Sequence, residues 1–323
     1  MIGTLAGQRM TAIVRRMMAT LSDKTPAPFF PGFRPLDVRA GGVHFAGAIG
    51  GDGPPVLLLH GYPQTHIAWR LIAPELATNH TVIIPDLPGY GSSQLLEVTP
   101  RWTKRRVGDA LVALMEMLGY GRFAVVGHDR GARAGYRLVL DHPTSVSAFA
   151  SLAVVPTLDA MASMDFRGAT KAFHWFLFAQ KADLPERLLA ADPDAFINSA
   201  LESMTEGRDF IEVAVMDAYR SAFRNPSVRR AILEDYRAAM DEDLAQDAAD
   251  FAAGRKIHCP VLALWPHAES EAGQPKPIDI WKRWGTDVSG TSTGGGHLQP
   301  EDAPAEVLGA LKPFLERRER VLY

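Results

Sequence analysis

The sequence has a single cysteine, no long apolar segment and almost no excess of either charge, and each shortage excludes a class of protein. Cys259 alone cannot form a disulfide framework or a cysteine-rich metal site, and we expect it to be a small buried residue. The longest apolar runs, such as 56–59 and 149–155, are too short to span a bilayer. Lys and Arg total 34 against 37 Asp and Glu, so the chain lacks the basic surface typical of nucleic-acid and membrane binding.

The rest of the composition is that of a globular protein with enough material for a large core. The chain has 323 residues, of which 47% are hydrophobic and 22% charged, values that exclude disorder over most of its length. Residues 1–25 contain several arginines and methionines but no apolar stretch followed by a small-residue cleavage site. We interpret them as a poorly ordered N-terminal extension, and we expect a cytoplasmic protein.

Short apolar runs alternate with segments of helical periodicity along most of the chain. Continuous apolar runs predict buried strands, and these fall at 43–48, 56–59, 81–85, 123–126, 149–155 and 261–265. Helices are expected at 103–118, at 130–141 and near the C-terminus, where Pro304 suits the first helical position and Pro313 should kink or end the helix. This alternation predicts an α/β fold with a mostly parallel sheet covered on both faces, whose active groups collect at the carboxyl ends of the strands.

Residues 157–256 interrupt the alternation with a stretch that is helical throughout. We expect this stretch to be a helical cap inserted into a core made of 26–156 and 257–323, lying over the ends of the strands.

The most specific motif is the Gly-x-nucleophile-x-Gly elbow at 127–131, placed between a predicted strand and a predicted helix. Its central residue is Asp129, where most proteins with this elbow carry serine. A carboxylate can displace a leaving group from saturated carbon and form an alkyl ester, whereas a serine alkoxide attacks acyl carbon. The alternative is that Asp129 is an ordinary helix N-cap.

Two further loops fit the same arrangement. His60-Gly61-Tyr62-Pro63 follows the 56–59 strand, and such a loop supplies one backbone N–H of an oxyanion hole, while the residue after the nucleophile supplies another. The candidate donors are therefore the N–H groups of Tyr62 and Arg130. Gly294-Gly295-Gly296-His297 lies before the last helix, and His297 in this position can act as the general base, or else be a solvated loop residue.

Four motifs together resemble the fluoroacetate (haloacetate) dehalogenases of the α/β-hydrolase superfamily: His60-Gly61-Tyr62-Pro63-Gln64-Thr65, Asp86-Leu87-Pro88-Gly89-Tyr90-Gly91, Gly127-His128-Asp129-Arg130-Gly131-Ala132-Arg133 and Leu262-Ala263-Leu264-Trp265. The resemblance runs from about residue 30 to residue 314. It implies that Asp129 is the nucleophile and that Arg130 and Arg133 hold the substrate carboxylate. Two guanidinium groups suit a short anionic acid and offset its repulsion from Asp129. The alternative for Arg133 is a surface helix residue.

The resemblance also assigns a halide site in the predicted cap. It places halide-binding roles on His174, Trp175 and Tyr236, whose N–H and O–H groups are directional donors, and Tyr219 is a weaker alternative to Tyr236. Taken alone, such an aromatic cluster would be core packing. The expected partner is a small haloacid, a homodimer is implied by the likeness, and no cofactor or metal is expected because neither dinucleotide glycines nor ligands at metal spacing occur.

One position departs from the family pattern. The acid that orients the catalytic histidine usually follows the strand after the elbow helix, and Ala153 stands there. The superfamily has a second location after the 261–265 strand, which here holds Glu269, with Glu271 two residues on. We interpret Glu269 as the relocated acid; the alternative is two exposed loop glutamates in an impaired enzyme.

Three functions follow from these residues. The first is hydrolytic dehalogenation of short 2-haloacids through an Asp129 ester that His297-activated water hydrolyses. The second is epoxide hydrolysis, with Tyr236 and Tyr219 protonating the opening ring. The third is a binding protein on the hydrolase fold that lost turnover when Ala153 replaced the acid.

Overall fold

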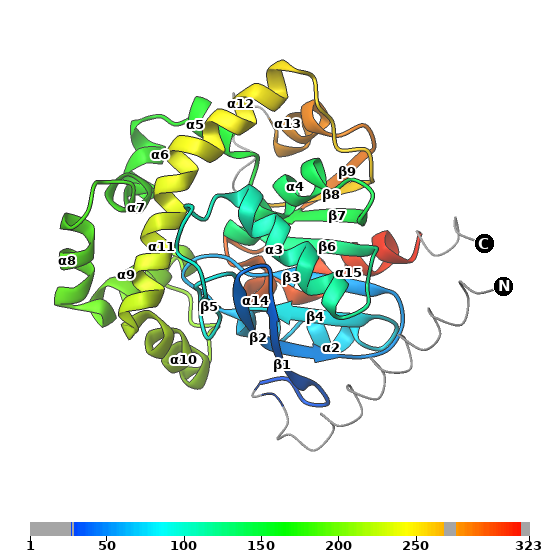
Figure 1. Ribbon diagram of the computed structural model, residues 1–323, viewed down its shortest axis with the longest axis horizontal. Helices are drawn as coiled ribbons and strands as arrows, with labels where there is room; N and C mark the ends of the chain where they lie inside the picture. The colour runs from blue at the N-terminus through cyan, green and yellow to red at the C-terminus, as the bar shows by residue number, and fades with distance from the viewer. Residues whose placement is uncertain (1–26, 28, 268–275, 318–323) are drawn as a thin grey trace.

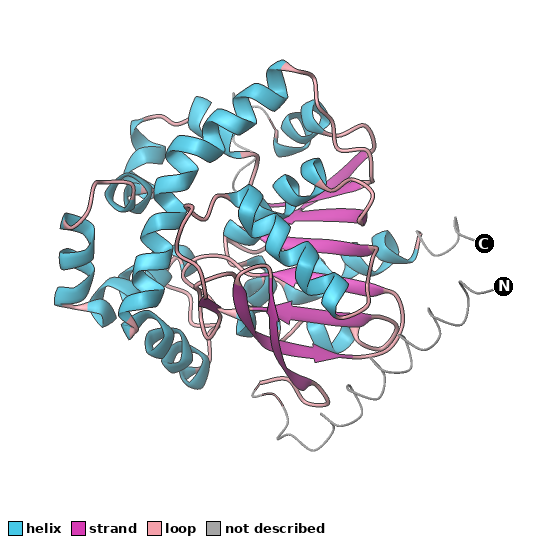
Figure 2. Cartoon of the chain, in the orientation of Figure 1, coloured by secondary structure: helices cyan, strands magenta, loops and turns pink. Residues whose placement is uncertain are grey.

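The computed structural model describes residue 27, residues 29–267 and residues 276–317, and it shows one central β-sheet flanked by helices (Figures 1 and 2). The strand order is β1-β2-β4-β3-β6-β7-β8-β9, and the short strand β5 pairs with β2. From β4 to β9 every neighbouring pair in this order is parallel, whereas β1 and β2 are antiparallel to their neighbours. The prediction of a mostly parallel α/β sheet is confirmed.

Each predicted apolar run overlaps a strand, and three further strands were not predicted. The bounds are β1 Arg34–Ala40, β2 Val43–Gly50, β3 Pro55–Leu59, β4 Thr81–Pro85, β5 Gln94–Leu95, β6 Phe123–His128, β7 Val146–Leu152, β8 Val261–Pro266 and β9 Val288–Thr293. The unpredicted strands β1, β5 and β9 lie at or near the edges of the sheet, where one side is solvated and a continuous apolar run is not required.

Strand β7 begins and ends three residues earlier than the expected 149–155. It stops because Ala153 adopts the left-handed region with φ 63°, and Pro156 follows shortly after. The apolar residues after Leu152 therefore belong to the connection that leaves the sheet, close to the site described below.

Helices cover both faces of the sheet. Figure 1 shows α3, α4 and α13 in front of the strands, and α2 and α15 behind them. The bounds are η1 His66–Trp69, α2 Ala73–Leu76, α3 Lys104–Met117, α4 Arg130–Asp141, α13 Pro277–Trp284, α14 Gln299–Asp302 and α15 Pro304–Glu316. Pro304 opens α15 as expected. Pro313 does not end it, because the helix continues to Glu316 and the Arg317 N–H still bonds to the Pro313 carbonyl oxygen.

The chain between β7 and β8 is helical. Its helices are α5 Thr157–Ala162, α6 Phe166–Lys171, α7 Phe173–Phe178, α8 Leu184–Ala191, α9 Pro193–Thr205, α10 Val213–Arg224, α11 Pro226–Ala238, the π-helical turn η2 Ala239–Asp243 and α12 Leu244–Ala252. In Figure 1 most of them gather on the left of the sheet, and their side chains meet residues from the ends of β3 and β6. The division into a core and a separate cap at 157–256 stays a prediction.

The interior is apolar along the central strands. Residues 56–59 of β3 and 82–84 of β4 are at most 1% exposed, which explains why these strands appear in the sequence as continuous apolar runs. Cys259 is half-buried, not fully buried as expected, because it lies in the connection just before β8. Within the described ranges, no helix has the length and apolar character needed to cross a membrane.

Candidate active site

Asp129 lies at the tip of a sharp turn between β6 and α4. Its backbone has φ 47° and ψ −115°, an uncommon conformation for a residue with a side chain. The flanking glycines are required by close approach: a Cβ atom on Gly127 would come within 2.5 Å of the Ala132 Cα atom, and one on Gly131 within 2.3 Å of the Leu59 carbonyl oxygen. The Asp129 side chain makes no capping hydrogen bond to α4, which argues against the helix-cap alternative.

The Asp129 side chain is 8% exposed, and its two carboxylate oxygens have different partners. Oδ1 accepts a hydrogen bond of 2.9 Å from the backbone N–H of Tyr62, one of the two predicted oxyanion donors. Oδ2 lies 3.6 Å from Nε2 of His297. Burial by itself would raise the pKa of Asp129, but His297, His128 and Arg130 outweigh burial and hold the pKa below its usual range. The carboxylate is therefore ionised at neutral pH, as a nucleophile must be.

His128, the residue before Asp129, anchors the loop that carries His297. Its Nε2 lies 2.8 Å from the backbone carbonyl oxygen of His297, and the two rings are 5.3 Å apart. Burial lowers the pKa of His128 to about 4, so its ring is neutral at pH 7 and Nε2 donates the hydrogen bond. The sequence reasoning missed this contact, although the residue's place inside the elbow motif was visible.

Ala153 directly follows β7, at the position where the resemblance leads us to expect the acid that orients the histidine. Its N–H donates to the Leu264 carbonyl oxygen over 2.9 Å, which holds the backbone at φ 63°. Asp and Asn tolerate this left-handed conformation better than alanine does, so the backbone here still suits an aspartate. Glu269 and Glu271 lie outside the described residues, and the relocation of the acid to Glu269 stays a prediction.

Arg130 is fully buried next to Asp129 and is held on two sides. Its Nε donates to Asp235 Oδ2 over 2.8 Å, and its Nη2 donates to the Asp235 carbonyl oxygen over 3.0 Å. Its guanidinium carbon lies 4.2 Å from the centre of the Tyr236 ring. Nη1 is buried and has no hydrogen-bond partner among the described residues, so this nitrogen is left to bind a ligand.

Arg133 lies one turn further along α4 and is 3% exposed, which excludes the surface-residue alternative. Its Nη1 donates to the Val155 carbonyl oxygen (3.1 Å) and to Thr157 Oγ1 (3.0 Å), while its guanidinium carbon lies 4.6 Å from the centre of the Trp175 ring. Nε is buried without a partner in the described part of the chain. Each arginine thus has a buried nitrogen without a hydrogen-bond partner among the described residues, Nη1 in Arg130 and Nε in Arg133.

The three predicted halide donors lie together and beside Tyr62, whose backbone N–H binds Asp129. The Tyr236 ring centre is 5.7 Å from that of His174 and 6.0 Å from that of Trp175, and the His174 ring stacks on the Tyr62 ring at 5.3 Å. Burial lowers the pKa of His174 to about 4 and raises that of Tyr236 well above its ordinary value. Both side chains are therefore neutral at pH 7 and can donate hydrogen bonds.

Tyr219 belongs to a different cluster. Its hydroxyl donates to the buried carboxylate of Glu301 over 3.2 Å, and the same carboxylate binds Arg70 and Gln64. This cluster joins α10 to helix α14, which directly follows His297, and to the loop after β3. The structure therefore brings Tyr236 to the site with His174 and Trp175, and it places Tyr219 in a network that supports the surrounding loops.

The assembled side chains can bind a small organic anion beside an ionised carboxylate. Two buried guanidinium groups each hold a nitrogen without a hydrogen-bond partner among the described residues, a backbone N–H supports one oxygen of the Asp129 carboxylate, and a histidine lies beside the other. Aromatic N–H and O–H donors close the site from the side of α7 and α11. The arrangement suits nucleophilic displacement followed by hydrolysis.

This elbow, fold and histidine define a hydrolase with an α/β architecture, and the comparison with known proteins agrees. Residues 54–223 match the sequence model of the α/β-hydrolase fold family. The chain belongs to this family.

Within the family, the chain is similar to two groups of enzymes. It is 34% identical over 290 residues to a fluoroacetate dehalogenase of Burkholderia sp, covering 88% of this chain and 95% of that protein. It is 29% identical over 282 residues to a soluble epoxide hydrolase of Corynebacterium sp. (strain C12), covering 85% and 94%. Among solved structures, a "putative epoxide hydrolase" from Pseudomonas aeruginosa is 48% identical, with a TM-score of 0.88 over 92% of this chain and 100% of that one. A mutant of that protein has been solved with bound MFA.

Proposed function

We propose that this enzyme hydrolyses the carbon–halogen bond of short 2-haloacids such as fluoroacetate, giving the 2-hydroxyacid and halide. The proposal rests on one observation above the others. Arg130 and Arg133 are both buried next to Asp129, and each keeps an unpartnered buried nitrogen, Nη1 and Nε respectively. A buried N–H donor without an acceptor is costly, so a ligand carboxylate that accepts from both nitrogens offsets that cost.

In the first step, the substrate carboxylate binds to the two arginines and its α-carbon lies above Asp129. The pKa of the Asp129 carboxyl group is held below its usual range, so the group is ionised. One of its oxygens attacks the α-carbon from the side opposite the halogen. The carbon–halogen bond breaks, and the halide leaves with the bonding electron pair toward His174, Trp175 and Tyr236. Their N–H and O–H groups bind the departing ion, and Asp129 becomes an alkyl ester.

In the second step, His297 takes a proton from a water molecule, and the hydroxide attacks the Asp129 carboxyl carbon. The developing negative charge settles on the oxygen that the Tyr62 N–H binds, with the Arg130 N–H as the second proposed donor. The intermediate collapses, and the 2-hydroxyacid leaves with the proton from His297. The proton that remains on the new Asp129 carboxyl group passes to solvent, and the Asp129 carboxylate now contains one oxygen from water. Glu269 is the proposed acid that holds His297.

The test is halide release from fluoroacetate and chloroacetate, followed by one turnover with excess enzyme in ¹⁸O-water. The mechanism requires ordinary oxygen in the first glycolate formed and ¹⁸O in Asp129, because the ester oxygen comes from the enzyme. Asp129→Asn should abolish halide release, and His297→Ala should accumulate a carboxymethyl ester on the peptide that contains Asp129. Full turnover in Asp129→Asn, or an adduct on another peptide, would refute the mechanism.

Epoxide hydrolysis is the second candidate, because the Tyr236 hydroxyl is protonated and buried near the nucleophile, and because an epoxide hydrolase is among the relatives. A neutral epoxide makes no use of two buried arginines, however, and the second tyrosine such a reaction would employ, Tyr219, bonds to Glu301. Diol formation from styrene oxide without halide release from haloacetates would establish the epoxide activity. Binding of acetate without turnover of either substrate would identify a binding protein.

A further inference from the structure

Asp235 is a buried acid that directly precedes Tyr236 on α11 and that the mechanism above does not use. It is 7% exposed, and three donors from three different elements converge on it. Oδ2 accepts from Arg130 Nε over 2.8 Å and from the Tyr90 hydroxyl over 2.9 Å, while Oδ1 forms an ion pair with Lys104. The backbone carbonyl oxygen of Asp235 accepts a second bond from Arg130, over 3.0 Å.

These bonds determine which part of Arg130 remains available. Asp235 occupies Nε and Nη2, the Tyr236 ring covers one face of the guanidinium group, and Nη1 alone is left without a partner among the described residues. A guanidinium group that could rotate about its long side chain would lose this orientation and part of its value in binding a carboxylate. Asp235 and Tyr236 are neighbours, so one turn of α11 determines both the orientation of the Arg130 guanidinium group and the position of a proposed halide donor.

We infer that Asp235 is a positioning residue that aims Nη1 of Arg130 at the substrate carboxylate, an inference that rests on the proposed function. It acts through Arg130 and does not touch the substrate. Lys104 and Tyr90, from α3 and the loop after β4, hold the Asp235 carboxylate in turn, and this links α11 to the core at the place where the substrate binds.

The central variant is Asp235→Asn, which keeps the size of the side chain and one oxygen acceptor but removes the charge. We expect the KM for fluoroacetate and chloroacetate to rise by roughly ten- to a hundredfold, the loss associated with one charge-assisted hydrogen bond, and kcat to change much less. The inhibition constant for acetate, a probe that cannot react, should rise by the same factor. Glu234→Gln is the matched control, because Glu234 is the neighbouring acid on α11, is only half-buried and pairs with Arg237, away from Arg130.

Asp235→Asn also leaves Lys104 buried without its acid, and the fold could suffer for that reason alone. The double variant Asp235→Asn/Lys104→Met removes the stranded cation, and thermal unfolding reports whether stability returns. If Asp235 positions Arg130, stability recovers and the high KM remains. Recovery of a wild-type KM together with stability would show a purely structural role and overturn the inference.

A double-mutant cycle tests whether Asp235 acts through Arg130. Arg130→Gln should raise the inhibition constant for acetate, and adding Asp235→Asn should raise it no further. Additive effects of the two changes would refute the inference.

The two proposals can fail separately. If the wild type releases halide and Asp235→Asn has an unchanged KM and acetate inhibition constant, the positioning role is wrong and the proposed function stands. If the wild type releases no halide, calorimetry with acetate replaces the kinetic assay. Weaker acetate binding in Asp235→Asn than in Glu234→Gln then supports the positioning role by itself, and equal binding overturns it.

Discussion

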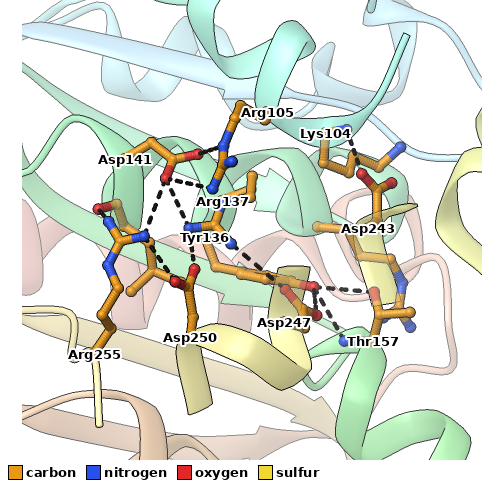
Figure 3. A network of polar contacts seen from close by, with 12 residues as sticks. Lys104, Arg105, Tyr136, Arg137, Asp141, Thr157, Asp243, Asp247, Asp250 and Arg255 are labelled. Carbon is orange, nitrogen blue, oxygen red and sulfur yellow. Dashed lines mark hydrogen bonds and ion pairs between the residues drawn. The ribbon is translucent and has the colours of Figure 1, made fainter. Parts of the chain in front are cut away.

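Replacing Asp247 should change how the stability of this enzyme depends on pH, and the size of the effect follows from the buried network in Figure 3. Asp247 is 1% exposed, accepts a hydrogen bond of 2.6 Å from the Tyr136 hydroxyl and lies 3.8 Å from Arg137. Arg137 makes shorter contacts of 2.8 Å and 2.6 Å with Asp141 and Asp250. Burial therefore dominates and raises the pKa of Asp247 from 3.8 to about 6.

Whether this residue stabilises the protein more in acid or at neutral pH depends on how the pKa of Asp247 differs between the native and unfolded chains. The unfolded chain loses the Asp247 proton near pH 4, whereas the native protein keeps it until about pH 6. The free energy of unfolding contributed by this residue is thus highest below pH 4 and falls as the pH rises to 6. At about 1.4 kcal/mol for each pKa unit, the full loss is about 3 kcal/mol, of which about 2 kcal/mol falls between pH 4.5 and pH 7.5.

Asp247→Asn keeps an oxygen acceptor for Tyr136 and cannot ionise. Relative to the wild type, we expect it to gain about 2 kcal/mol in the free energy of unfolding between pH 4.5 and pH 7.5. Urea unfolding at both pH values, followed by tryptophan fluorescence with the m-value checked for constancy, measures this difference. A difference between variant and wild type that does not change with pH would refute the reasoning.

Asp250→Asn is the matched control from the same network. Arg255 and Arg137 outweigh the effect of burial and hold the pKa of Asp250 below its ordinary value. This carboxylate therefore stabilises the protein above its unfolded pKa, and its contribution disappears as the pH falls through its native pKa. Asp250→Asn should be less stable than the wild type at pH 7.5, with a deficit that shrinks in acid, opposite to Asp247→Asn.

The remaining predictions concern turnover. His174→Phe and Trp175→Phe should each slow defluorination by roughly a hundredfold, as expected for a lost donor to developing charge, and slow debromination less, because fluoride concentrates its charge; equal losses would indicate packing residues. Glu269→Gln should leave alkylation of Asp129 intact and slow hydrolysis of the ester by up to ~10⁴-fold, so that the ester accumulates in intact-mass spectra; an unaffected enzyme would refute the relocation. Ala153→Asp in that background should restore part of the activity, and its failure would show that a carboxylate at this strand end does not reach His297.

Local sequence was sufficient to predict those elements whose structure is dictated by steric contacts between nearby residues or by burial. The elbow around Asp129 could be predicted because a backbone this tight, packed against the neighbouring strand, admits only glycine at 127 and 131. The parallel strands could be predicted because strands buried on both faces are continuously apolar. The strands β1 and β9 were missed because edge strands lack that pattern, and β7 was extended too far because the apolar residues after Leu152 continue past a left-handed turn at Ala153.

The predicted site residues rest on two kinds of signal. Asp129 and His297 follow from motifs, whereas the roles of Arg133, His174 and Tyr236 came from resemblance, since their spacing alone is equally typical of a helical core. Tyr219 could not be separated from Tyr236 by sequence, because both are tyrosines on helices. The structure distinguishes them by their partners, Glu301 for one and the Arg130 guanidinium for the other.

The sequence by itself was enough to predict the fold class, the elbow that carries Asp129 and the loop that carries His297, because each depends on residues within a few positions of one another. Only the tertiary structure decided that Asp235 meets Arg130 across 105 positions and that His128 reaches the His297 carbonyl oxygen across 169. Those contacts depend on the path of the whole chain, on which face of α11 packs against the sheet and on where each loop returns. A buried ion pair needs only one residue from each of two distant segments, so it produces no repeating pattern that could be recognised in the sequence.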